Sequence, residues 1–296
     1  MPRRRDVERY APRRETRHAS LADFEAAGPG SGIHSISAGE ATVDLLLDDD
    51  VQSGSLVVFL PSAVNSSVSW PYFQGLSLAT VTGQPLLSFS DPTIERSTGI
   101  TTAWTLGDDR YWLHHEMDRY IDAVRRGRRL IFVGSSAGGF PALYYGSRYP
   151  DSVSVVVNPR THLFTPPTHL QLTPSRLYGA EGTVDRISEL VPLAPGSPGN
   201  TVVYLQNSAD HVYFSGHMVP YLQQAEPGAR IWTHLGDWGA GHKPAPPAFL
   251  HEVVRTLATA DTLDEGIHRL PLERFAGLDA VRAEQMDQNI RHFTAG

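Results

Sequence analysis

An α/β fold with a mostly parallel sheet and helices on both faces is the architecture that this sequence predicts. Short apolar runs alternate with segments of helical spacing along most of the 296 residues, which is typical of strands joined by crossover helices. Several runs, including residues 56–60, are apolar without interruption, as expected of strands covered on both faces. A chain of this length is also long enough to bury one large core.

The expected strands are short runs that each end near a turn-forming residue such as Pro, Gly, Asn or Asp. They cover residues 41–47, 56–60, 85–89, 129–133, 153–157, 201–205 and 230–235. Between them, apolar residues recur at the spacing of a helix with one buried face. Helices are expected over residues 111–126, 140–149, 218–224 and 247–260.

The chain is expected to divide into an N-terminal arm, a catalytic domain and a C-terminal tail. Residues 1–20 are basic and poor in apolar residues, which predicts a solvated, flexible arm. Residues 21–262 hold the strands and helices of the catalytic domain. Within them, residues 161–197 are irregular and rich in Pro and Leu, and we expect a small cap insertion there. Residues 263–296 form a polar tail with a helix expected over 278–291.

Composition and charge exclude several classes of function. The formal net charge is -7, so no nucleic-acid partner is expected. Cysteine is absent, which excludes disulfides, thiol catalysis and Cys-type zinc sites; no metal site and no cofactor is expected. No apolar stretch approaches the length of a membrane span, and residues 1–20 lack the apolar core of a secretory signal. The expected location is cytoplasmic.

The chemistry of the chain is expected at the segment Gly134-Ser135-Ser136-Ala137-Gly138, which matches the pattern G-x-S-x-G. An apolar run precedes it and a helical segment follows, and this is the context of a nucleophile elbow. The sharp turn would hold the Ser136 hydroxyl above the sheet edge, with glycines where side chains would collide. The Ala137 N–H can then face a developing oxyanion. A phosphate-binding turn fits less well, because neither G-x-x-x-x-G-K-[ST] nor G-x-G-x-x-G is present.

A serine hydroxyl is a poor nucleophile until a base removes its proton. In folds with this elbow, an Asp or Glu and then a His follow the serine along the chain. Asp210 follows the expected strand 201–205, and His242 follows the strand 230–235 in a glycine-rich loop. We therefore expect His242 to act as the general base and Asp210 to orient its ring.

Several residues compete for these roles. His211, His217 and His234 are the rival bases, although His234 lies inside an expected strand. Asp237 is the rival acid, but it would have to bind His242 from within the same loop. His211 adjoins Asp210 and is expected to shape the same pocket.

A second oxyanion donor is expected in the loop after the strand 56–60. Ala63 is the first choice and Ser62 the second, although this loop lacks the His-Gly pair that is usual there. Ser62, Asn158 and His211 are the expected contacts with substrate.

These residues carry a resemblance to a known superfamily. The segment from Gly134 to Gly139, followed by Asp210 and His242, resembles the α/β-hydrolases over about residues 33–262. A narrower likeness points to a bacterial branch found with surface polysaccharide biosynthesis and with accessory secretion of glycosylated adhesins. It is carried by Ser90-Asp91-Pro92, Ala103-Trp104, Leu106-Gly107-Asp108, Gly134–Phe140 and Asn158-Pro159-Arg160-Thr161.

The narrower resemblance implies O-acyl transfer to sugars, notably of acetyl groups. The chain departs from that branch at Arg160, where the usual sequence is Asn-Pro-Gln-Thr, and it is far shorter than the multidomain adhesin-associated members.

The expected function is therefore that of a serine-dependent acyl enzyme that works through an acyl-Ser136 intermediate. Its partners would be a small-molecule ester or acyl donor and a glycan acceptor. A carboxylester hydrolase and an O-acyltransferase share every step up to acylation, so the three residues do not separate them. Two alternatives stay open: a non-catalytic scaffold in a glycan or secretion assembly, and a serine peptidase.

Overall fold

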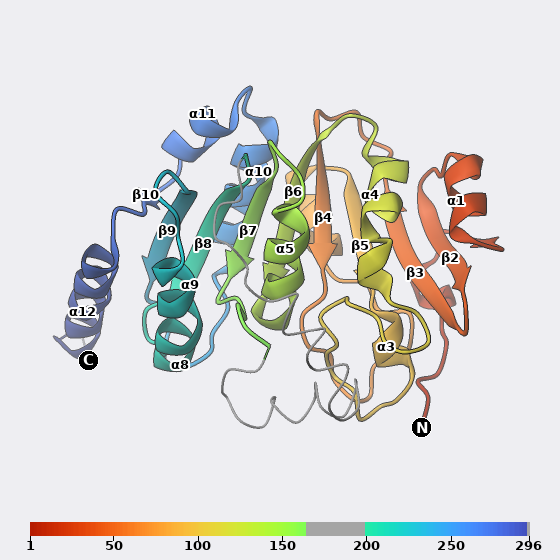
Figure 1. The fold of residues 1–296 in the computed structure, drawn as a ribbon, viewed down its shortest axis with the longest axis horizontal. Coiled ribbons are helices and arrows are strands. Elements are labelled where there is room, and N and C mark those ends of the chain that lie inside the picture. The colour runs from red at the N-terminus through yellow and green to blue at the C-terminus, as the bar shows by residue number, and fades with distance from the viewer. Residues whose placement is uncertain (164–198, 295–296) are drawn as a thin grey trace.

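The computed structural model describes residues 1–163 and 199–294, and this part of the chain forms one ten-stranded sheet (Figure 1). The strand order is β1-β2-β3-β5-β4-β6-β7-β8-β9-β10. The strands from β5 to β9 run parallel, whereas β2 with β3, β3 with β5, and β9 with β10 pair antiparallel. The mostly parallel sheet that the sequence predicts is thereby confirmed. The strands are β1 (Glu15–His18), β2 (Gly32–Ala38), β3 (Ala41–Asp48), β4 (Ser55–Leu60), β5 (Leu86–Ser90), β6 (Arg129–Ser135), β7 (Val153–Val157), β8 (Thr201–Asn207), β9 (Arg230–Gly236) and β10 (Glu273–Arg274).

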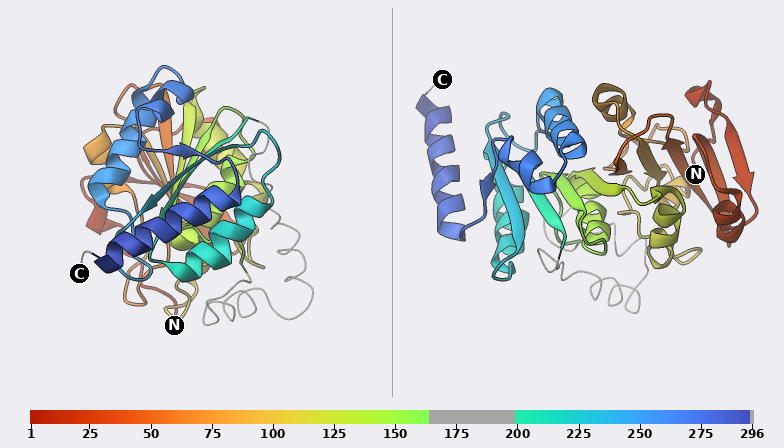
Figure 2. Two further views of the ribbon diagram at one scale, coloured as in Figure 1. Left: turned by 90° about the vertical axis from the view of Figure 1, so that its left-hand side faces the viewer. Right: turned by 90° about the horizontal axis from the view of Figure 1, so that it is seen from above.

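Helices cover both faces of this sheet (Figure 2). Helices α4, α5 and α9 pack on one face, and α2 and α10 pack on the other. Within the described residues, every helix is too short or too polar to span a bilayer. The helices are α1 (Leu21–Ala27), α2 (Leu76–Thr82), α3 (Pro92–Glu95), α4 (Met117–Arg125), α5 (Gly139–Gly146), α8 (His211–Tyr213), α9 (Val219–Gln223), α10 (Pro247–Thr259), α11 (Leu263–His268) and α12 (Leu278–Thr294), with 3-10 turns η1 (Glu8–Tyr10), η2 (Leu113–His115) and η3 (Ser136–Gly138) and a π-turn η4 (Phe214–Met218).

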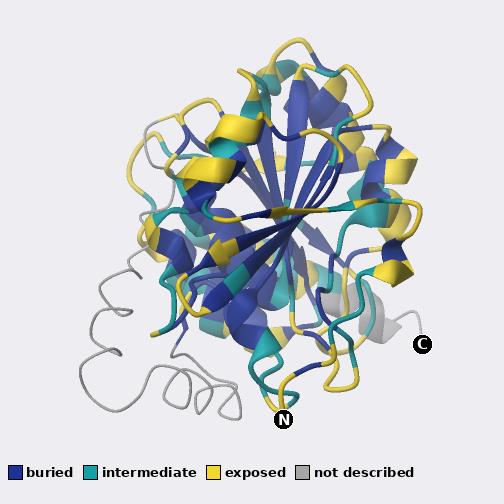
Figure 3. Ribbon diagram, turned by 90° about the vertical axis from the view of Figure 1, so that its right-hand side faces the viewer, coloured by how far each residue is buried: buried dark blue, intermediate teal, exposed yellow. Residues whose placement is uncertain are grey.

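The central strands are apolar without interruption because both of their faces are buried. In β6, Leu130 and Phe132 pack under α4 and α5, whereas Ile131 and Val133 pack under α10. Successive side chains of a strand point to opposite faces. One apolar strand therefore contributes side chains to the hydrophobic core on each face of the sheet. Figure 3 shows the result: the central strands are buried, and exposed residues lie on the outer sides of the helices, on loops and on the edge strand β1.

The N-terminal residues are part of this fold, and the expectation of a solvated arm is wrong. Residues 15–18 form β1 and pair with β2. Arg3 is 5% exposed, and its guanidinium donates to five backbone carbonyl groups. Arg5 forms an ion pair with the buried Asp44 at 2.7 Å. The charge pattern predicted solvation because a linear sequence does not reveal the buried acceptors of these arginines.

One helix and one strand differ from the sequence predictions. The helix expected over 111–126 begins only at Met117, because Asp108 and Tyr111 pair in a tight turn. Gly107 permits this turn, since a Cβ there would lie 2.1 Å from the Tyr111 carbonyl oxygen. The strand β2 was not expected at all, because it buries polar residues such as His34 and Ser35. The cap expected over 161–197 lies almost wholly outside the described residues.

Candidate active site

Ser136 lies in the sharp connection between β6 and α5. Its φ of 52° is in the left-handed region, which costs energy in any residue with a Cβ and recurs at functional turns. The turn is closed by glycines. A Cβ on Gly134 would lie 2.0 Å from the Gly138 carbonyl oxygen, and a Cβ on Gly138 would lie 2.4 Å from the Leu60 carbonyl oxygen. The pattern G-x-S-x-G thus has a steric cause in this fold.

The structure brings Ser136, His242 and Asp210 into one hydrogen-bonded chain. The Nδ1 atom of His242 is 2.5 Å from Asp210 Oδ2, and its Nε2 atom is 2.9 Å from Ser136 Oγ. The Asp210 side chain is 3% exposed. A carboxylate accepts only, so Nδ1 carries the proton that faces it, and Nε2 is left to accept from the hydroxyl. This is the arrangement that a general base requires.

The rival residues point elsewhere. His217 lies in η4 and accepts a hydrogen bond from the Thr161 N–H at 3.3 Å. His234 lies on β9 with its Nδ1 atom 2.9 Å from the Pro271 carbonyl oxygen. His211 is exposed at the start of α8, and Asp237 accepts from the Gly239 N–H within its own loop. No contact of these four side chains with Ser136 is seen among the described residues.

Asn207, which the sequence analysis did not single out, fixes the loop that carries His242. It is the last residue of β8, and its Nδ2 atom donates to the carbonyl oxygens of Gly239 at 2.8 Å and of Gly241 at 2.7 Å. Both glycines have positive φ, of 95° and 77°, which glycine adopts without strain. One buried amide therefore sets the path of the loop that carries His242.

Asn158 supports the same loop from the neighbouring strand. Its Nδ2 atom donates to the Lys243 carbonyl oxygen at 2.6 Å, and its Oδ1 atom accepts from the Asn207 N–H at 2.6 Å. The side chain is 1% exposed. Asn158 was expected to contact substrate, but in this structure its amide binds protein on both sides and holds His242 indirectly.

Replacing Asn207 with alanine is expected to lower kcat for ester hydrolysis by about 10²-fold, because misplacing a catalytic group by about 1 Å costs that much. Steady-state kinetics with p-nitrophenyl acetate would measure it. Asn200→Ala is the matched control, since Asn200 is also buried at one end of β8 but binds Ser152. Equal rates in Asn207→Ala and the wild type would show that the loop needs no such support.

The loop after β4 passes close to the elbow and offers one backbone donor. Gly138 packs against the Leu60 carbonyl oxygen at the end of β4. The Ser62 N–H donates to Gln74 Oε1 at 3.0 Å, as does the Ser62 hydroxyl. The Val64 N–H donates to the Thr101 carbonyl oxygen at 2.8 Å. The neighbouring donors are thus engaged, and the exposed Ala63 is the better candidate beside Ala137. Both assignments stay predictions.

Arg160 stabilises the turn at Ser136 through a backbone hydrogen bond. Its backbone N–H donates to the Ser136 carbonyl oxygen at 2.8 Å. Its side chain is fully buried and donates to the carbonyl oxygens of His162 and Leu163, with the guanidinium over the Trp104 ring. Burial lowers the pKa of this guanidinium. Arg160 is therefore an internal residue of the fold.

Asp91 ties a neighbouring loop to the helix after the elbow. Its carboxylate accepts from the N–H groups of Thr93 at 3.0 Å and of Thr105 at 2.7 Å, and burial raises its pKa to about 6. The Thr105 carbonyl oxygen in turn accepts from the Tyr145 hydroxyl on α5 at 2.6 Å. The sequence Ser90-Asp91-Pro92 thus has a structural role beside the site.

Tyr213 is a second residue at the site that the sequence analysis did not single out. Its hydroxyl is 3.4 Å from Ser136 Oγ, and its ring stacks on the His242 imidazole with centroids 3.9 Å apart. The available signal was its position three residues after Asp210, in the first turn of α8.

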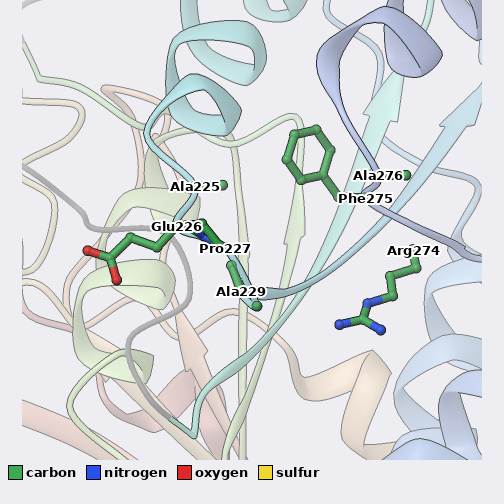
Figure 4. Close-up of a pocket in the computed structure, with 8 residues that line it drawn as sticks. Ala225, Glu226, Pro227, Ala229, Arg274, Phe275 and Ala276 are labelled. Carbon is green, nitrogen blue, oxygen red and sulfur yellow. The ribbon is translucent and has the colours of Figure 1, made fainter.

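One pocket of the described residues lies apart from these side chains. A pocket of about 490 Å³ lies between the segment after α9 and β10 (Figure 4). It is lined by Ala225, Glu226, Pro227, Gly228, Ala229, Arg274, Phe275 and Ala276, and none of these is a candidate site residue. In the part of the chain that the structure describes, no group of three His, Asp or Glu side chains is placed to bind a metal ion.

Comparison of the sequence with family models and with curated proteins finds no match in either. Solved structures do match. A capsule O-acetyltransferase of Neisseria meningitidis serogroup A is 14% identical, with 81% of this chain and 100% of that chain covered and a TM-score of 0.53. A protein described as a hydrolase from Agrobacterium vitis S4 is 16% identical, with 78% and 100% covered and a TM-score of 0.55. The chain therefore has an α/β-hydrolase-like fold, with Ser136 at the turn between β6 and α5.

Proposed function

We propose that this chain is a serine-dependent acyl enzyme, either a carboxylester hydrolase or an O-acyltransferase, that works through an acyl-Ser136 intermediate. The observation that carries this proposal is the chain of hydrogen bonds from Asp210 through His242 to Ser136. An inert scaffold would need neither this series of hydrogen bonds nor a serine held at positive φ.

In the first half-reaction, His242 Nε2 removes the Ser136 proton while Oγ attacks the acyl carbon of the donor. Asp210 holds the ring and stabilises the imidazolium. The tetrahedral oxyanion receives hydrogen bonds from the Ala137 N–H and the Ala63 N–H. The bond to the leaving group then breaks, and the leaving oxygen or sulfur takes the proton from His242, which leaves acyl-Ser136.

In the second half-reaction, a hydroxyl group attacks the acyl carbon of acyl-Ser136, and His242 removes the proton of that hydroxyl. The bond to Ser136 Oγ breaks, and Oγ regains its proton from His242. With water the product is a free acid, and with a sugar hydroxyl it is a sugar ester. The likeness in fold to the meningococcal capsule O-acetyltransferase, together with the sequence resemblance, supports a sugar acceptor.

A fluorophosphonate probe tests the acyl enzyme directly. We expect stoichiometric labelling of the wild type, with the adduct found by mass spectrometry on the peptide that contains Ser136. Ser136→Ala is expected to lose the label and at least about 10³-fold in the hydrolysis of p-nitrophenyl acetate. Ser135→Ala is the matched control, since Ser135 precedes the elbow residue and is expected to keep both. Labelling that survives in Ser136→Ala would sink the assignment, and an unlabelled wild type would favour a non-catalytic scaffold.

Product analysis separates water from sugar as the acceptor. The enzyme would be incubated with an acetyl donor, such as acetyl-CoA or p-nitrophenyl acetate, in the presence and absence of neutral oligosaccharides. Acetyl-CoA is a reasonable donor to test because a variant of the meningococcal enzyme was solved in complex with CoA. An acyltransferase gives acetylated sugar with little free acetate, and a hydrolase gives free acetate at the same rate with or without sugar.

A further inference from the structure

Tyr213 contacts all three members of the proposed catalytic chain. Its backbone N–H donates to Asp210 Oδ1 at 3.1 Å. Its ring stacks on the His242 imidazole with centroids 3.9 Å apart and planes 25° apart. Its hydroxyl lies 3.4 Å from Ser136 Oγ. A side chain that serves only as core packing would not need to reach the acid, the base and the nucleophile together.

The hydroxyl of Tyr213 faces the Ser136 oxygen as a donor. The Ser136 hydroxyl gives its proton to His242 Nε2 at 2.9 Å, so Oγ is left with its lone pairs. At 3.4 Å the contact with Tyr213 is longer than an ordinary O–H···O hydrogen bond. Catalytic hydrogen bonds are often long in a free enzyme and tighten as charge develops. The contact can therefore strengthen when Oγ becomes negative.

The ring of Tyr213 faces the imidazole as it becomes charged. His217 also contacts this ring, in a tilted arrangement with centroids 4.8 Å apart. An aromatic face within about 6 Å of a cation attracts it. The stacked ring thus favours the imidazolium that His242 forms when it accepts the serine proton.

We propose that Tyr213 is a catalytic residue that donates a hydrogen bond to Ser136 Oγ when this oxygen attacks and again when it leaves, while its ring stabilises the His242 imidazolium. This inference rests on the proposed acyl-enzyme function. No proton is transferred to or from Tyr213: His242 takes the serine proton and returns it. The tyrosine lowers the cost of negative charge on the oxygen that is attacking in the first half-reaction and departing in the second.

The test compares Tyr213→Phe, which keeps the ring and loses the hydroxyl, with the wild type in single-turnover kinetics. Acylation by p-nitrophenyl acetate and deacylation are both expected to slow by about tenfold, as for loss of one hydrogen bond to a charged oxygen. KM for the ester is expected to stay within about twofold, because the bond forms to the enzyme's own oxygen. Tyr221→Phe, at a buried tyrosine on α9, is the matched control and is expected to keep both rates.

A second variant tests the ring of Tyr213. Tyr213→Leu removes the stacked face together with the hydroxyl, so it is expected to slow acylation more than Tyr213→Phe does. Equal acylation rates in the two variants would contradict the role of the ring.

Fluorophosphonate labelling keeps the two proposals apart. A wild type that is not labelled at Ser136 contradicts the acyl enzyme itself. A labelled wild type with Tyr213→Phe rates within about twofold of it overturns the role of the hydroxyl and leaves the acyl enzyme standing. Equal losses in Tyr213→Phe and Tyr221→Phe also overturn it, since they indicate a general effect of buried tyrosines. If Tyr213→Leu fails to fold, Tyr213→Phe still decides the role of the hydroxyl.

Discussion

Asp210→Asn is expected to lower kcat for acylation by about 10⁴-fold while the protein stays folded. The carboxylate lies 2.5 Å from His242 Nδ1 and is the acceptor of the proton on that nitrogen. The asparagine amide would donate there instead, so the proton would move to Nε2, where the ring must accept the serine proton. The other oxygen can still cap α8, because Oδ1 of either residue accepts from the Tyr213 N–H. The substitution is therefore expected to lower kcat while the fold stays unchanged.

Burst kinetics with p-nitrophenyl acetate would measure the acylation step, and the free energy of unfolding in urea would verify the fold. Asp237→Asn is the matched control, since Asp237 is the rival acid and lies in the same loop as His242. It is expected to keep kcat within about twofold, because its carboxylate caps the Gly239 N–H, as an amide oxygen also can. A loss below about tenfold in Asp210→Asn, or an equal loss in the control, would reassign the acid.

The positions of the proposed catalytic residues follow from sequence because of a property of parallel sheets. The carboxyl ends of parallel strands meet at one edge, so residues just after β6, β8 and β9 converge although 106 positions separate Ser136 from His242. The unbroken apolar runs identified those strands. Chain order then selected Asp210 and His242 from the other acids and histidines, and the structure joins these two by a hydrogen bond.

What the sequence did not reveal depends on contacts between distant or irregular segments. Tyr213 reaches the site because the first turn of α8 points back over His242, a direction that spacing does not encode. Asn207 is the last residue of a buried strand, and only the path of the later loop gives its amide two carbonyl partners. The burial of Arg3 was not predicted either, because a basic residue in an apolar-poor segment is usually solvated.

Arg3→Ala is expected to lower the free energy of unfolding by about 3 kcal/mol, since hydrogen bonds to charged groups each contribute about 1.5–3 kcal/mol and do not add fully. The guanidinium donates to the Ile94 carbonyl oxygen and to four others at 2.8–3.0 Å. Three of the five acceptors belong to Asn65, Ser66 and Val68, in the loop that also carries Ala63. Urea denaturation, followed by circular dichroism, would measure the change.

The same substitution separates stability from catalysis. Because Arg3 fixes the loop after β4, Arg3→Ala is expected to slow acylation by about tenfold even at temperatures where the variant is folded, through a loosened Ala63 donor. Arg3→Lys can form only some of the five hydrogen bonds, since a lysine has three donors. Its acylation rate is therefore expected to lie between those of the wild type and of Arg3→Ala. Arg4→Ala is the matched control, as the exposed Arg4 side chain adjoins Arg3 in the chain. If Arg3→Ala loses stability but acylates at the wild-type rate, the loop does not depend on Arg3 for its catalytic geometry.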